Sequence, residues 1–149
     1  MSEVPLADDA VADDPLAIVR RVGMGGLATK MGIEITEFTI ERTVGTMPVD
    51  GNTQPAGLMH GGAYVVLGET LGSFAAMLHA GIGRQTVGIE VNATHTRAAR
   101  SGIVTGVCTP VHLGRTLATH EIAVSDDQGR RCSTIRITNL ILDASQRGS

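Results

Sequence analysis

The sequence predicts an α+β fold in which a curved antiparallel sheet wraps around one long central helix. Residues 61–78 form an apolar run whose only charged residue is Glu69, a pattern typical of a helix that is covered on most sides. Four segments rich in β-branched residues follow this run, and short polar connections separate them. The apolar helix would find its cover in the sheet that these segments form.

The segments before the apolar helix are short. Residues 1–13 are acidic and aperiodic, so we expect a disordered tail there and a single domain over residues 14–149. Asp14 followed by Pro15 is typical of a helix start, and this helix should end near Val22, where a glycine-rich segment begins. The remaining segments are two strands and one irregular loop, at residues 33–38, 43–49 and 50–59.

The long helix begins after His60 and should end near Gly81, because glycine readily takes the left-handed conformation that caps a helix. Turn residues after it separate four predicted strands, at residues 85–96, 102–112, 116–125 and 130–142. The connections are short enough for each of these strands to pair with the next one in antiparallel fashion.

Composition argues against several classes of protein. One Tyr, two Phe and no Trp leave few rings for base stacking, so we expect no nucleic-acid partner. The N-terminus lacks the basic start and apolar run of a signal peptide, and Glu69 interrupts the one long apolar run, so we expect a cytoplasmic protein with no membrane segment.

Cys108 and Cys132 are far apart in the sequence, and no two histidines have a spacing that suits a metal site. We therefore expect reduced core cysteines, no metal and no cofactor.

Glu69 is the first candidate for a functional residue. An ionised side chain in an apolar helix costs free energy unless a site requires it. The alternative is that Glu69 lies on a solvent-facing stripe, which would need further polar residues three and four positions away. The residues at those positions are apolar or small, namely Val65, Val66, Gly72 and Ser73. This pattern favours a functional carboxylate with free space beside it.

Glu69 belongs to a set of residues whose types and separations along the chain resemble those of a known family. Gln54 precedes His60-Gly61-Gly62 by six residues, and Glu69 follows His60 by nine. The set resembles the hotdog-fold acyl-CoA thioesterases, in particular the phenylacetate-type and 4-hydroxybenzoyl-CoA-type branch. The resemblance covers roughly residues 33–142 and implies hydrolysis of acyl- or aroyl-CoA thioesters to the free acid and coenzyme A.

The residue types also suit acyl transfer by themselves. Free N–H groups at a helix start can polarise a thioester carbonyl, and Gly61 and Gly62 let that carbonyl approach closely. The Gln54 amide could donate a second hydrogen bond. Glu69 would serve as nucleophile or as general base, two roles that the sequence does not separate. We expect the Ser73 side chain to orient the water or the substrate, although it could equally be a small residue that only packs. We expect His60 to cap the helix.

Distance along the helix predicts a second subunit. Glu69 and Gly61 are eight residues apart, which is about 12 Å at roughly 1.5 Å per residue, too far for both to reach one carbonyl. We therefore predict a homodimer as the minimal active unit, with Gly61 of one chain facing Glu69 of another, and expect a dimer of dimers. For the coenzyme A phosphates we expect contacts from Arg97, Arg115 and Thr116.

Two other functions stay open on the same fold. A non-catalytic acyl-CoA-binding module would not need the carboxylate at Glu69. A hydratase would want an Asp and His pair near the helix start, but the chain has no Asp between Asp50 and Asp126. The acyl group, and the choice between coenzyme A and a carrier protein, stay open as well.

Overall fold

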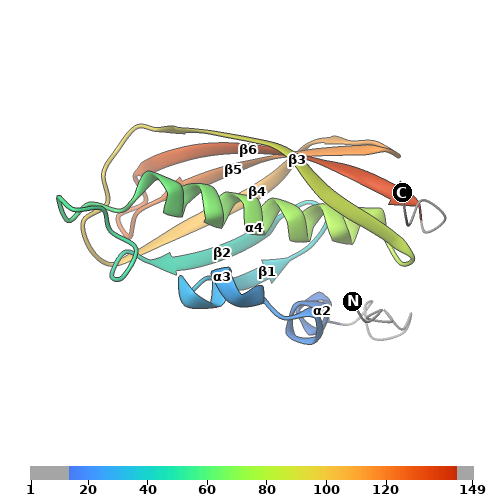
Figure 1. The fold of residues 1–149 in the computed structure, drawn as a ribbon, viewed down its shortest axis with the longest axis horizontal. Helices are drawn as coiled ribbons and strands as arrows, with labels where there is room; N and C mark the ends of the chain where they lie inside the picture. The colour runs from blue at the N-terminus through green and yellow to red at the C-terminus, as the bar shows by residue number, and fades with distance from the viewer. Residues whose placement is uncertain (1–13, 144–149) are drawn as a thin grey trace.

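The computed structural model describes residues 14–143, and the tail predicted for residues 1–13 lies outside this range. Six antiparallel strands form one sheet that curves around the long helix α4 (Gly61–Ala80), as Figure 1 shows. The predicted fold class is therefore confirmed, and the long helix lies where its apolar sequence placed it.

Two short helices precede the sheet. Helix α2 (Pro15–Val22) begins at Asp14, whose side chain accepts a hydrogen bond from the Leu16 N–H at 3.1 Å. Helix α3 (Gly25–Lys30) occupies the glycine-rich segment that we expected only to end the first helix. It forms despite its glycines because Ala28 packs into the main core, where burial outweighs a weak helix propensity.

The strand order corrects one prediction. The order across the sheet is β1 (Glu34–Phe38), β2 (Thr43–Pro48), β4 (Ile103–Leu113), β5 (Leu117–Ser125), β6 (Arg131–Asp143) and β3 (Arg84–His95). The prediction that β3 pairs with β4 is wrong, since β3 pairs with β6 and β4 pairs with β2.

The connection between β3 and β4 explains this difference. Instead of closing a hairpin, its backbone bonds to the segment before α4: the Val49 N–H donates to Gly102 O at 2.9 Å, and the Met59 N–H donates to Ala99 O at 2.8 Å. The chain therefore crosses the end of the sheet beside the start of α4. This crossing brings residues 96–98 next to the loop that contains Gln54.

Two glycines let α4 lie close to the sheet. A Cβ at Gly72 would lie 2.2 Å from Ile137 Cγ2, and a Cβ at Gly68 would lie 2.7 Å from Ile135 Cγ2. By length and composition alone, α4 is apolar enough to cross a membrane. In this fold its apolar inner face, centred on Leu67 and Leu71, packs in the main core instead.

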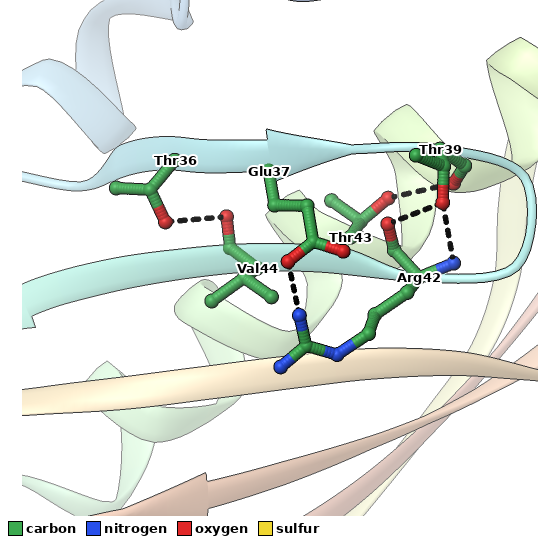
Figure 2. Close-up of polar contacts among 6 residues, drawn as sticks. All are labelled: Thr36, Glu37, Thr39, Arg42, Thr43 and Val44. Carbon is green, nitrogen blue, oxygen red and sulfur yellow. Dashed lines mark hydrogen bonds and ion pairs between the residues drawn. The ribbon is translucent and has the colours of Figure 1, made fainter.

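The two edges of the sheet differ in chemistry. The edge at β1 is short, carries a bulge and is polar: Glu37 forms an ion pair with Arg42, and Thr39 exchanges two hydrogen bonds of 3.0 Å with the Arg42 backbone (Figure 2). The edge at β3 also has a register shift, between Gly88 and Glu90, but it is twelve residues long and exposes Val87, Ile89 and Val91 by 48%, 56% and 37%. Native edges are usually protected by the devices found at β1, so the bare edge at β3 is suited to a partner.

Candidate functional site

The start of α4 presents one free backbone donor. His60 is the N-cap, and its Nδ1 accepts a hydrogen bond from the Gly62 N–H at 2.8 Å, as expected for a capping residue. The Ala63 N–H donates to His60 O at 2.9 Å. Within residues 14–143, the Gly61 N–H has no partner in this first turn. Gly61, and not Gly62, therefore offers the donor that a bound carbonyl could use.

Gln54 lies in the loop before α4, and the loop fixes its side chain. The Gln54 N–H donates to Leu58 O at 2.8 Å, and the Gly57 N–H donates to Gln54 O at 2.9 Å, which closes the loop on itself. The side-chain oxygen accepts a hydrogen bond from the Ala56 N–H at 2.6 Å. Because the oxygen is held in this way, the side-chain NH2 group stays available as a donor.

A hollow of about 360 Å³ joins these groups at the helix start. We call it the helix-start hollow. Its walls come from the loop, the first turn of α4, the end of β3 and the crossing that follows: Gln54, Leu58, Met59, Gly61, Tyr64, His95, Thr96, Arg97 and Ala98. The structure thus brings Gln54, Gly61 and Arg97 together; the sequence paired Gln54 with Gly61, whereas the place of Arg97 beside them was not predicted.

His95 belongs to this hollow, although the spacing of the histidines gave no reason to choose it. A Cβ on Gly61 would lie 2.9 Å from His95 Nε2. The Ser133 hydroxyl donates to Thr94 O at 3.3 Å and lies 2.9 Å from His95 Nδ1. The Ser133 hydroxyl thus connects the His95 ring to the β3 backbone, and Nε2 is the ring nitrogen that faces the helix start. The one signal in the sequence that could have pointed to His95 is its position, two residues before the predicted phosphate contact Arg97.

A second hollow, of about 400 Å³, contains the carboxylate. We call it the mid-helix hollow. Glu69 and Ser73 both line it from α4, and α3 forms the opposite wall; the other lining residues are Met24, Gly25, Gly26, Leu27, Ala28, Val66, Thr70 and Phe74. Glu69 is exposed in the single chain, and it forms no hydrogen bond or ion pair with any residue from 14 to 143. A ligand can therefore reach the carboxylate.

One chain keeps the two hollows apart. Gly61 and Glu69 lie on one helix, eight residues and about 12 Å apart along its axis. The donors at the helix start and the carboxylate of the same chain therefore do not face one carbonyl group.

Arg115 and Thr116 lie at a third position. They follow Gly114 in the turn between β4 and β5, and His79 Nε2, in the last turn of α4, lies 2.9 Å from Gly114 O. Arg97 is at the opposite end of the helix. The structure does not bring these three predicted phosphate-binding residues together within one chain.

Neither cysteine takes part in these hollows. Cys108 and Cys132 are free and buried, as expected of core residues. Burial raises the pKa of the Cys108 thiol to about 12, so this thiol is protonated at neutral pH and is not a nucleophile. Within the described range, 14–143, no three metal-ligating side chains gather into a group.

Comparison with known proteins identifies the family. The chain matches the model of the thioesterase superfamily over residues 56–133. It is 44% identical over 128 residues to the proofreading thioesterase EntH of Cronobacter turicensis, a match that covers 85% of this chain and 93% of that protein.

Solved structures agree with this match. A mutant thioesterase from Pseudomonas aeruginosa is 38% identical with a TM-score of 0.82, over 88% of this chain and 96% of that one. A thioesterase from Haemophilus influenzae is 36% identical with a TM-score of 0.80, over 84% of this chain and 88% of that one. The chain therefore belongs to the thioesterase superfamily and is a hotdog-fold enzyme that hydrolyses thioesters.

Proposed function

We propose that the enzyme hydrolyses acyl- or aroyl-CoA thioesters to the free acid and coenzyme A, at sites that two chains build together. The observation that carries this proposal is the division of polar groups between the two hollows. The helix-start hollow has donors and no carboxylate, whereas the mid-helix hollow has a carboxylate with free space around it. Hydrolysis of a thioester needs both kinds of group at one carbonyl.

The helix-start hollow would hold the thioester carbonyl. The Gly61 N–H and the Gln54 NH2 group donate to its oxygen, and the positive end of the α4 dipole favours the negative charge that develops there. A glycine is required here, because any Cβ would meet His95 Nε2 at 2.9 Å and disturb this wall of the hollow.

Glu69 of the partner subunit would act on the carbonyl carbon from the other side. As a general base it takes a proton from water, the hydroxide adds to the carbon, the C–S bond breaks, and the thiolate takes up a proton. As a nucleophile it adds directly, releases the thiol and forms an anhydride that water then opens. Ser73 lines the same hollow one helical turn further on and would orient the water or the acyl group.

The bare edge at β3 and the outer face of α4 form the surface for this partner. The edge at β3 exposes apolar side chains, and Glu69 is exposed on α4 where the mid-helix hollow opens. A two-fold arrangement over this surface would give two equivalent sites. Arg97 would then bind coenzyme A phosphate beside the helix start, while Arg115 and Thr116 would come from another subunit of a dimer of dimers.

The experiment that tests the substrate class measures free-thiol release from a panel of acyl- and aroyl-CoA esters, with Glu69→Ala beside the parent. We expect release by the parent and a loss of at least two orders of magnitude in the variant. If carrier-protein thioesters alone are cleaved, the coenzyme A assignment fails. If no thioester is cleaved although acyl-CoA binds, the non-catalytic binding module replaces it.

A further inference from the structure

One asparagine anchors the loop that leads into α4. Asn52 is half-buried at the base of this loop, two residues before Gln54. Its side-chain NH2 group donates one hydrogen bond to Met31 O at 2.8 Å and another to Pro48 O at 2.9 Å. Met31 is the C-cap of α3, and Pro48 is the last residue of β2. Both hydrogens of one amide therefore join the loop to two separate elements.

A turn directs the Asn52 side chain back toward β2. The Asn52 N–H donates to Val49 O at 3.0 Å, which closes a turn over residues 49–52. The third residue of this turn, Gly51, has a φ of +78°, a conformation that glycine takes without strain. The sequence here therefore combines a glycine that reverses the chain with an amide that ties the reversed chain down.

The backbone of Asn52 also holds the start of α4. The His60 N–H donates to Asn52 O at 2.9 Å. His60 is the N-cap of α4, and the next residue, Gly61, lines the helix-start hollow. Beside this bond, Thr53 and Met59 form an isolated antiparallel bridge. Asn52 thus lies where the two arms of the loop meet, at the base from which both donors of the helix-start hollow extend.

The two arms of the loop are attached in different ways. The second arm is tied to the connection before β4, because the Met59 N–H donates to Ala99 O at 2.8 Å. On the first arm, the backbone hydrogen bonds of Gln54 stay within the loop, and the tip at residues 55–57 is exposed. Loss of the Asn52 amide would therefore release the arm that carries Gln54 while the other arm stays attached. A displacement of about 1 Å in a catalytic group can cost about a hundredfold in rate.

We propose that Asn52 is a positioning residue, which fixes the Gln54 NH2 group relative to the Gly61 N–H so that both donors reach one carbonyl oxygen. The inference deepens the proposed function and rests on the roles given there to these two donors. Because the donors act on charge that develops in the transition state, the anchor should affect kcat far more than KM.

Two substitutions of Asn52 test the anchor. Asn52→Ala removes the amide and leaves the backbone hydrogen bonds of the turn and of His60 in place. We expect it to lower kcat about tenfold to a hundredfold and to change KM by less than about twofold. Asn52→Asp keeps the size of the side chain but turns an oxygen toward the two carbonyl oxygens, so it should be at least as slow.

Thr53→Ala is the matched control. Thr53 is the next residue of the same loop, is exposed, and forms no side-chain hydrogen bond with residues 14–143. Its kcat and KM should equal those of the parent. A loss in Thr53→Ala as large as the loss in Asn52→Ala would overturn the proposal, because any disturbance of the loop would then suffice.

A double variant separates positioning from a general loss of stability. Gln54→Ala leaves no side-chain amide to position, so the addition of Asn52→Ala should lower kcat by a smaller factor there than in the parent. Equal factors in the two backgrounds would overturn the proposal, as would a parent-like kcat for Asn52→Ala. If Asn52→Ala does not fold, Asn52→Gln, which moves the same NH2 group outward by one methylene, decides by the same comparison.

Amide hydrogen exchange measured by NMR tests the anchor without any activity. Asn52→Ala should speed exchange at the backbone N–H groups of Gln54 and His60 and leave exchange at Leu71, inside α4, unchanged. Unchanged exchange at Gln54 and His60 would overturn the inference and leave the proposed function intact. Faster exchange in a protein that cleaves no thioester supports the anchor and overturns the proposed function instead.

Discussion

Gly61 and Glu69 lie on one helix, yet they face two different hollows. The donor and the carboxylate of a single chain are about 12 Å apart along the helix axis, whereas a reacting carbonyl must lie about 3 Å from each. This separation is the structural reason for expecting shared sites, and it leads to the first prediction.

Mixing two inactive variants should restore activity. Gln54→Ala damages only the helix-start half of a site, and Glu69→Ala damages only the carboxylate half. In a heterodimer of the two, one of the two sites has both halves intact. Equal amounts, unfolded and refolded together, should recover about a quarter of the parent rate per chain. Each variant refolded alone serves as control, and an absence of recovery in the mixture would contradict a shared site.

Substitution of Gly61 should affect catalysis far more than folding. A Cβ at this position would lie 2.9 Å from His95 Nε2 and 3.0 Å from His95 Cδ2, so the first turn of α4 or the His95 ring must shift. Gly61→Ala keeps the N–H donor but misplaces it, and should lower kcat/KM about a hundredfold. Thermal unfolding should change by only a few degrees. A variant with parent-like kcat/KM would show that the carbonyl binds elsewhere.

Gly72 should be intolerant of the substitution that usually stabilises helices. Replacement of a helical glycine by alanine ordinarily gains about 1 kcal/mol. At Gly72 the new methyl group would lie 2.2 Å from Ile137 Cγ2, so α4 must move away from β6. We expect Gly72→Ala to lower the free energy of unfolding by about 1–3 kcal/mol in urea titrations.

Gly26 provides the comparison for Gly72. It lies in α3, and a Cβ there meets nothing within 4 Å. Gly26→Ala should therefore leave the free energy of unfolding unchanged or raise it. Destabilisation of similar size in both variants would mean that the close approach to Ile137 is not the cause.

His120 should make the fold sensitive to acid. Burial, with the nearby His79, lowers its pKa to about 4 from an ordinary value of 6.5, so the unfolded chain binds a proton that the folded protein refuses. The contribution of neutral His120 to the free energy of unfolding is fully present above pH 6.5 and is lost as the pH drops toward 4. Thermal melts across this range should show a weaker pH dependence for His120→Leu than for the parent. Identical slopes would place the titrating group elsewhere.

The buried thiols should resist modification. Cys108 and Cys132 are 1% and 0% exposed, and burial raises the pKa of Cys108 to about 12. Ellman's reagent at pH 8 should therefore label neither thiol in the folded protein and both in guanidinium chloride. Fast labelling of the folded protein would indicate an opening of the sheet around α4.

Local sequence patterns were sufficient for α2, for the long helix and for the strands, and insufficient for α3 and for the pairing of the strands. The long helix and the strands follow from apolar runs, β-branched residues and turn residues, which act over a few positions. The pairing of β3 with β6 depends on where the connection before β4 finds its hydrogen bonds, namely at Val49 and Met59. Helix α3 depends on the burial of Ala28. Neither cause is visible within the segment itself.

The candidate site was predictable to the same extent. Gln54, Gly61 and Glu69 follow from residue type and spacing along one loop and one helix. His95 lies at the end of a strand, 34 positions after Gly61 in the sequence, and yet its ring contacts the helix start. Its place two residues before Arg97 was the one sequence signal, and its proximity to Gly61 shows that it lines the helix-start hollow. The contacts of the Asn52 amide with α3 and β2 become visible only in the folded chain.

The contrast between the two sheet edges has a consequence for the behaviour of the protein at high concentration. Addition of strands from other chains can proceed at β3, where apolar side chains are bare, but is opposed at β1 by a short strand and the Glu37 and Arg42 pair. A chain with one open and one closed edge cannot polymerise through edge pairing, because each added copy presents its closed edge outward. The same asymmetry that permits one neighbour protects the protein against fibrous aggregation.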